Sequence, residues 1–225
     1  MTADSDSDHQ GTGPDHDVDG AADIGADVDA AADVEIDRED VPDWDDEYVD
    51  RVSDRLLFNY DLENDRREGR FSFTLYGRMQ VHNQKHFLHP AINFADHDAT
   101  EHLFVTRIDA IERGDLERLV SLGHDLADEW IDADEEHFST DFTFGVIADS
   151  IPEAVEEFVS GFEDRNLLRY GFYGHYEVNL FVVAPSDEAV VASEGADVAE
   201  AFALWEPIER EEPGLWDLFK RRFQL

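Results

Sequence analysis

Two long segments in which apolar and polar residues alternate constrain the fold of this chain most strongly. The first, FSFTLYGRMQV, spans residues 71–81, and one of its parities is apolar: Phe71, Phe73, Leu75, Met79 and Val81. The opposite parity carries Ser72, Thr74, Tyr76, Arg78, Gln80 and, one residue further on, His82. Because successive side chains of a strand point to opposite faces, this pattern predicts a strand with one buried and one solvated face.

The second alternating segment is RYGFYGHYEVNLFVVAP, residues 169–185. Its apolar parity holds Tyr170, Phe172, Tyr176, Val178, Leu180 and Val182, and its polar parity holds Tyr173, His175, Glu177 and Asn179. Gly171 and Gly174 indicate a bulge, a bend or the turn of a hairpin within it. Shorter strand patterns occur at 101–108 and 139–148, and a weaker one at 85–94 contains Pro90, which favours a sheet edge.

Apolar residues at helical spacing predict helices near 45–60, 115–131 and 196–205. A further helix is predicted after SIPE, residues 150–153, a pattern typical of a capping box with proline just inside the helix start. Alternating strands favour an antiparallel sheet with one solvated face, and the helices then cover the other face. The predicted fold class is α+β: a two-layer domain with a mainly antiparallel sheet and helices on one face.

The first 42 residues differ in composition from the rest of the chain. They consist largely of Asp, Ala, Gly and Ser and contain no aromatic residue, so they bury too little apolar surface to offset the entropy of ordering. We therefore predict a disordered acidic tail at 1–42 and a single α+β domain at 43–225.

The net charge of the chain is −39, from 56 acidic and 17 basic residues. The acidic excess is not confined to the tail, since residues 51–225 alone carry a net charge of −21. Self-repulsion of this size is tolerated where salt at about 1 M shortens the Debye length to about 3 Å. The composition resembles that of acidic proteins from haloarchaea that accumulate salt. The resemblance implies a saline habitat and implies no activity.

Several classes of protein are disfavoured by composition. The chain has no cysteine, so neither disulfides nor thiolate chemistry is available to it. No run of about 18 apolar residues could span a bilayer, and MTADSDSDHQ does not resemble a signal peptide. We therefore expect a cytoplasmic protein that does not bind membranes. We also expect it not to bind nucleic acid, because its only internal basic cluster is expected in a loop and consists of Arg66, Arg67 and Arg70.

Histidines gather between residues 82 and 102, where five of the ten in the chain occur: His82, His86, His89, His97 and His102. Zinc sites built without cysteine use histidine and carboxylate ligands, so these five side chains are candidate metal ligands. The alternative is a polar hairpin with solvated imidazoles. Because Asn83, Gln84 and Pro90 disfavour a helix that would align His82, His86 and His89, the sequence favours the hairpin. No cofactor is required by the sequence.

The solvated face of the predicted sheet offers a second candidate site. If the two alternating strands are neighbours, one surface would gather Tyr76, Arg78, His82, Tyr173, His175 and Glu177. Such a set suits a small anionic ligand or acid–base chemistry. The alternative is an ordinary solvated sheet face.

The C-terminal segment PGLWDLFKRRFQL is predicted to form a short amphipathic helix. Its apolar face holds Leu215, Trp216, Phe219 and Phe223, beside Lys220, Arg221 and Arg222. The face can dock on the core of the same chain, or it can bind a partner or a second copy.

Two functions remain open at this point. The first is a non-enzymatic, salt-adapted interaction or accessory domain. The second is a small-ligand-binding or metal-assisted hydrolase-like protein that uses the polar sheet face and the histidines between 82 and 102.

Overall fold

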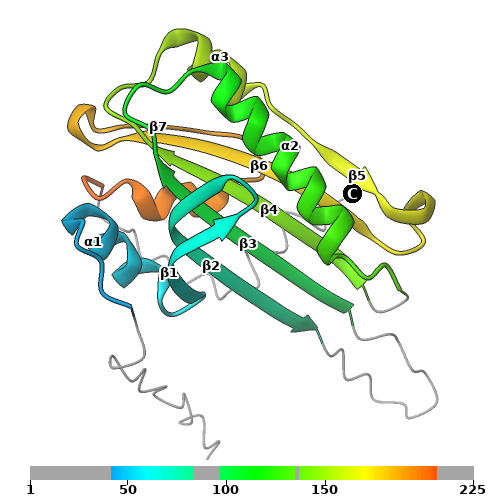
Figure 1. Ribbon diagram of the computed structural model, residues 1–225. Helices are drawn as coiled ribbons and strands as arrows, with labels where there is room; N and C mark the ends of the chain where they lie inside the picture. The colour runs from blue at the N-terminus through cyan, green and yellow to red at the C-terminus, as the bar shows by residue number, and fades with distance from the viewer. Residues whose placement is uncertain (1–41, 84–96, 135–136, 207–225) are drawn as a thin grey trace, which may run out of the picture. The chain divides into compact units, whose positions relative to one another are not determined.

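The α+β class and the mainly antiparallel sheet predicted from the sequence are confirmed. A computed structural model of the protein describes residues 42–83, 97–134 and 137–206, and all of them belong to one compact unit (Figure 1). The unit contains one open seven-stranded sheet together with helices.

The elements follow one another in this order: α1 (Glu47–Leu56), β1 (Asp61–Glu68), β2 (Phe71–Asn83), β3 (His97–Arg107), α2 (Arg113–Trp130), β4 (His137–Ile147), α3 (Glu153–Ser160), β5 (Arg165–Leu167), η2 (Leu168–Gly171), β6 (His175–Ala184), η3 (Pro185–Asp187), β7 (Ala189–Ala192) and η4 (Asp197–Phe202). The elements labelled η are short 3₁₀ helices.

The strands are arranged in the order β1-β2-β3-β4-β6-β5, and β7 also pairs with β6. Four pairings are antiparallel, whereas β3–β4 and β4–β6 are parallel. Parallel neighbours need a crossover connection, and α2 and α3 lie in these two connections. The parallel centre of the sheet was not predicted from the sequence.

The main core lies between the sheet and α2, which runs across β4 and β6 (Figure 1). Phe104 of β3, Phe144 of β4 and Leu180 of β6 are fully buried there against Leu116 and Leu119 of α2. Burial of such side chains stabilises the fold by roughly 1.5–3 kcal/mol each. This face of the sheet is therefore packed rather than solvated.

A second core occupies part of the opposite face of the sheet. Val52 of α1 and Phe202 of η4 are buried there with Val105, Phe181 and other apolar residues of the strands. The rings of Phe181 and Phe202 lie 4.6 Å apart, between centroids. The sequence prediction placed helices on one face only. The central strands carry apolar residues at both parities, as in Leu103-Phe104-Val105. Helices can therefore pack against both faces of the sheet.

Two local predictions are wrong. The capping box predicted at 150–153 does not form, because Pro152 has extended backbone angles and is itself the N-cap of α3, without a side-chain cap bond. A capping box occurs instead at the start of α2, between Glu112 and Asp115. Arg66 and Arg67 lie in strand β1 rather than in a loop.

Other predictions are confirmed in part or lie outside the described residues. The helix predicted near 196–205 is the shorter 3₁₀ segment η4. The strand predicted at 85–94, most of the tail at 1–42 and the C-terminal amphipathic helix lie outside the described residues. Among the described helices, none combines the length and the apolar character needed to cross a membrane.

Candidate functional site

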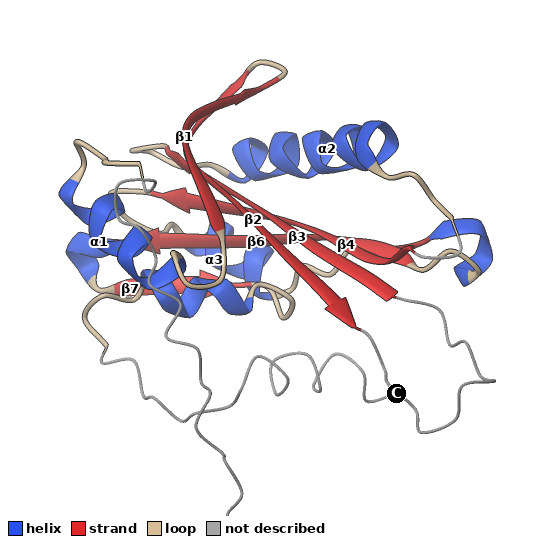
Figure 2. Cartoon of the chain, turned by 90° about the horizontal axis from the view of Figure 1, so that it is seen from below, coloured by secondary structure: helices blue, strands red, loops and turns tan. Residues whose placement is uncertain are grey.

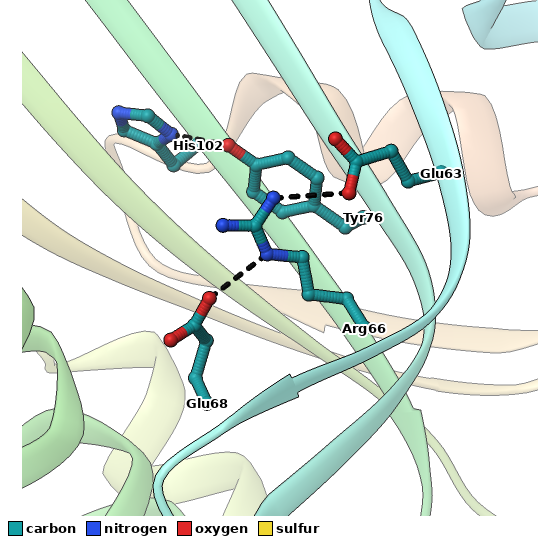
Figure 3. Close-up of polar contacts among 5 residues, drawn as sticks. All are labelled: Glu63, Arg66, Glu68, Tyr76 and His102. Atoms are coloured by element: carbon teal, nitrogen blue, oxygen red, sulfur yellow. Dashed lines mark hydrogen bonds and ion pairs between the residues drawn. The ribbon is translucent and has the colours of Figure 1, made fainter.

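A tyrosine and a histidine form a buried polar pair on the α2 side of the sheet. The phenol oxygen of Tyr76, on β2, lies 2.8 Å from Nδ1 of His102, on β3 (Figure 3). Both residues are almost completely buried, with exposed fractions of 3% and 9%. The two atoms share one hydrogen bond, and the imidazole tautomer decides which of them donates.

Aromatic side chains surround this pair. The His102 ring stacks on Phe142 at 5.4 Å and meets the edge of Trp130 at 5.0 Å, both measured between centroids. Burial, with smaller contributions from the charges of Arg78 and Arg66, lowers the pKa of His102 to about 4. Burial likewise raises the pKa of Tyr76 to about 12. Both groups are consequently neutral at neutral pH, and the pair is poorly suited to exchanging protons with a substrate there.

Arg66 closes over the pair from β1. The β1–β2 hairpin turns out of the plane of the sheet toward the side of α2 (Figure 2), and Asp65 has a positive φ of 52° in β1. The Arg66 guanidinium carbon lies 4.2 Å from the centre of the Tyr76 ring and 5.4 Å from that of Trp130. The guanidinium also donates to Glu63 at 3.0 Å and to Glu68 at 2.8 Å (Figure 3). Arg66 therefore ties the hairpin to the core.

Four of the six residues predicted to share a polar face are divided between the two faces of the sheet. Arg78 pairs in register with His102, and Tyr76 with Phe104, on the α2 side. His175 and Glu177 have the parity of Phe181, which packs in the core on the opposite side. In addition, β3 and β4 separate β2 from β6. The premise that the two strands are neighbours was wrong, so Tyr76 and Arg78 do not share a surface with His175 and Glu177.

The remaining members of that set fall in different places. Tyr173 lies in the turn before β6, where its carbonyl oxygen is 2.8 Å from Nδ1 of His137. His82 pairs through its backbone with Asp98 near the end of β2. Tyr76 was expected on a solvated face, yet it is buried because α2 and the β1 hairpin cover its side of the sheet.

The structure describes three of the five clustered histidines, His82, His97 and His102. His82 and His97 occupy adjacent backbone positions of β2 and β3, and His102 is buried. His86 and His89 lie outside the described residues. Within the described ranges, no three His, Asp or Glu side chains are close enough to hold a metal ion. The metal site stays a prediction.

A second histidine–tyrosine contact joins α2 to β6. Nδ1 of His124 lies 3.1 Å from the phenol oxygen of Tyr176, and Nε2 lies 3.2 Å from Oδ2 of Asp164. Burial, followed by the charges of Asp164 and Asp128, raises the pKa of Tyr176. A raised pKa opposes formation of a phenolate nucleophile, so this chain of polar groups acts as a structural link.

Among the described residues, three of the five exposed large apolar side chains lie at the turn between β5 and β6, residues 167–173, which we call the aromatic turn. Tyr170 is 95% exposed, Phe172 83% and Leu167 63%. Arg169 and Tyr170 both have positive φ angles, of 48° and 62°. Such angles are costly for residues other than glycine and persist only where the surroundings impose them.

Contacts at both ends hold the aromatic turn in this conformation. The Leu168 amide donates to the Gly174 carbonyl at 3.0 Å, and the Tyr173 amide donates to the Leu168 carbonyl at 3.4 Å. Gly174 has φ 73°, and a Cβ there would lie 2.0 Å from the carbonyl oxygen of Phe138 on β4. The turn is thus built on a position that only glycine can occupy.

Sequence reasoning missed the exposure of this turn. It assigned Tyr170 and Phe172 to the apolar parity of a long strand, whereas β6 begins only at His175. Gly171 and Gly174 had indicated a bulge, a bend or the turn of a hairpin within that strand, and the structure has a turn there.

A family model described as "Domain of unknown function (DUF8052)" matches residues 45–204, which include β1 to β7 and the aromatic turn. Neither a curated protein nor a solved structure matches the chain.

Proposed function

The chain belongs to the DUF8052 family, and we propose that it is a non-enzymatic interaction domain that binds a protein partner through the aromatic turn. The observation that carries this proposal is the near-complete exposure of Tyr170 and Phe172 on a backbone fixed in an unfavourable conformation. Aromatic side chains dominate binding energy at protein interfaces. A turn held in place beforehand loses little entropy when a partner binds.

The chemistry of the partner follows from the charges around the turn. Arg165 and Arg169 flank the exposed aromatic side chains, and both are exposed. Arg165 lies 3.5 Å from Glu177, and no ion pair of Arg169 occurs with another described residue. In a chain of net charge −39, the aromatic turn itself carries one cation, Arg169, and no acidic residue. We propose a partner surface with an apolar pocket edged by carboxylates.

The setting of this interaction is also part of the proposal. The acidic composition supports a protein adapted to concentrated salt, and we propose that it works in the cytoplasm of a salt-accumulating cell. Under such conditions long-range attraction between exposed charges is screened. Apolar anchors such as Tyr170 and Phe172 then contribute most of the affinity, because salts that strengthen apolar burial favour them.

Recovery of partners from the native cell tests the proposal. Tagged wild-type protein and a Tyr170→Ser/Phe172→Ser variant are purified from lysate in concentrated KCl, and the recovered proteins are compared quantitatively. A Phe58→Ser variant is the matched control, because Phe58 is 73% exposed but lies away from the turn, between α1 and β1. A partner lost only with the double variant is then purified. Its binding should weaken at least about tenfold for the double variant, as for interface anchors generally.

A further inference from the structure

Arg78 of β2 and His102 of β3 stand directly opposite one another on the α2 side of the sheet. Opposite residues of an antiparallel pair have Cβ atoms about 4.5–5.5 Å apart, so the two side chains are neighbours. Arg78 is exposed, whereas His102 keeps an exposed fraction of only 9%. The sheet therefore places a cation in contact with solvent beside a nearly buried imidazole.

The hydrogen bond to Tyr76 determines which nitrogen of His102 carries the proton. The Tyr76 phenol is buried, and among the described residues its oxygen has one hydrogen-bond partner, Nδ1 of His102. If Nδ1 donated to this oxygen, the phenol hydrogen would be buried without an acceptor, which is costly. The phenol therefore donates to Nδ1, and the neutral imidazole carries its hydrogen on Nε2.

The Nε2–H group of His102 is not used within the described part of the chain. Nε2 lies on the side of the ring that points away from Tyr76 (Figure 3), and no described residue accepts a hydrogen bond from it. Arg78 likewise makes no ion pair with any described residue, although the chain contains 56 acidic residues. One fixed N–H donor and one positive charge are thus left side by side.

The electrostatic potential at the His102 ring is positive. Burial is the largest cause of the lowered pKa of His102, and the charges of Arg78 and Arg66 lower it further. A potential that opposes a proton on the ring favours an anion beside it. The charge of Arg66 is already balanced by its ion pairs with Glu63 and Glu68. Arg78 remains as one unbalanced cation, which matches a ligand with a single negative charge.

We propose that the Arg78 guanidinium and the Nε2–H group of His102 bind a small carboxylate with one negative charge. The planar guanidinium matches the two carboxylate oxygens, and the imidazole N–H donates to one of them. Chloride cannot accept two parallel hydrogen bonds in this way, so a carboxylate is preferred even in concentrated KCl. A phosphate dianion would bring a second charge without a cation to balance it. Strand β4 separates β3 from β6, so this site is not part of the aromatic turn.

Nitrogen NMR of the intact wild-type chain labelled with ¹⁵N-histidine tests the donor. At neutral pH, His102 should show a protonated Nε2 and an unprotonated Nδ1, two states with well-separated chemical shifts. The spectrum of His102→Gln identifies these signals by their absence. A proton on Nδ1 would overturn the proposal, because Nε2 would then be an acceptor and would repel a carboxylate.

Titration of the same wild-type sample with potassium acetate, exchanged for KCl at constant ionic strength, tests binding. We expect a saturable shift of the His102 Nε2 signal. Arg78→Gln should weaken acetate binding at least about tenfold, as expected for the loss of a hydrogen bond to a charged group. Arg67→Gln removes an exposed arginine that also makes no ion pair with a described residue, and it should bind acetate as the wild type does. An absent shift in the wild type, or an equal loss in both variants, would overturn the proposal.

Potassium phosphate distinguishes the class of ligand. At slightly alkaline pH, where phosphate is largely a dianion, it should shift the Nε2 signal less than the same concentration of acetate does. A larger response to phosphate would overturn the assignment to carboxylates. The measurement needs no partner protein, so its result is separate from that of the partner-recovery experiment.

Discussion

The phenol oxygen of Tyr76 lies 2.8 Å from Nδ1 of His102, and this hydrogen bond is enclosed by the rings of Phe142 and Trp130. The pair is held by strands β2 and β3, by helix α2 and, through Arg66, by the β1 hairpin. A polar pair at the meeting point of four elements fixes their arrangement, because a misplaced element would leave a buried polar group unsatisfied.

Removal of one hydroxyl measures the contribution of this pair. Tyr76→Phe leaves Nδ1 of His102 buried without its partner and should lower the free energy of unfolding by about 1–2 kcal/mol. Tyr170→Phe removes the same hydroxyl from a side chain that is 95% exposed, and it should change stability by less than about 0.5 kcal/mol. Denaturant melts in constant KCl give both values, and equal effects of the two changes would contradict the role assigned to the pair.

Acid should destabilise the fold through His102. Its pKa is about 4 in the folded chain, against an ordinary value of 6.5, so between these values the unfolded chain binds the proton and the folded chain does not. Stability is complete above about pH 6.5 and declines as the pH falls toward 4, by up to about 3 kcal/mol. Melts of the wild type and of His102→Gln across this range should show a shallower slope for the variant. Parallel slopes would rule out His102 as a source of the acid sensitivity.

The attachment of the β1 hairpin depends on Arg66. Arg66→Met removes a positive charge that lies over the rings of Tyr76 and Trp130 and that pairs with Glu63 and Glu68. We expect the free energy of unfolding to fall by about 1 kcal/mol. Arg67→Met changes an exposed neighbour on the same strand and is the control. Thermal unfolding of the two variants gives the comparison. If Arg66→Met lowered the melting temperature no more than Arg67→Met, the hairpin would be held by other contacts.

Gly145 is required by the second core. A Cβ at this position of β4 would lie 2.1 Å from the ring of Phe181, which is fully buried under η4. Gly145→Ala should therefore destabilise the protein by about 3 kcal/mol or more, since the ring cannot move away. Gly114→Ala, on α2, meets its nearest neighbour only at 3.7 Å and should be neutral or stabilising. A soluble, fully stable Gly145→Ala protein would contradict this packing.

The sequence predicted those elements whose residues alternate or repeat clearly. Strand β2 and helix α2 were expected at 71–81 and 115–131 and lie at Phe71–Asn83 and Arg113–Trp130. Strand β1, DLENDRRE, has no apolar alternation because its exposed and half-buried side chains are almost all polar, so no periodicity revealed it. Its place is set by pairing with β2 and by Arg66, which are contacts made only in the folded chain.

The candidate site was less predictable than the fold. Tyr76 and His102 were each singled out, but their contact depends on the register between β2 and β3, which one sequence does not encode in a readable way. The division of the predicted polar face follows from strand order, since β3 and β4 separate β2 from β6. The exposure of the aromatic turn was missed because Tyr170 and Phe172 share the apolar parity of β6, although both precede its first residue, His175.

The central claim, that the aromatic turn is the partner-binding surface, is tested most directly by site-specific photo-cross-linking in the native cell. A photoreactive amino acid replaces Phe172 in one protein and Phe58 in another, since both side chains are highly exposed. We predict one dominant cross-linked protein partner from position 172 and none in common from position 58. Cross-links that are absent at 172, or identical at the two positions, would contradict the account.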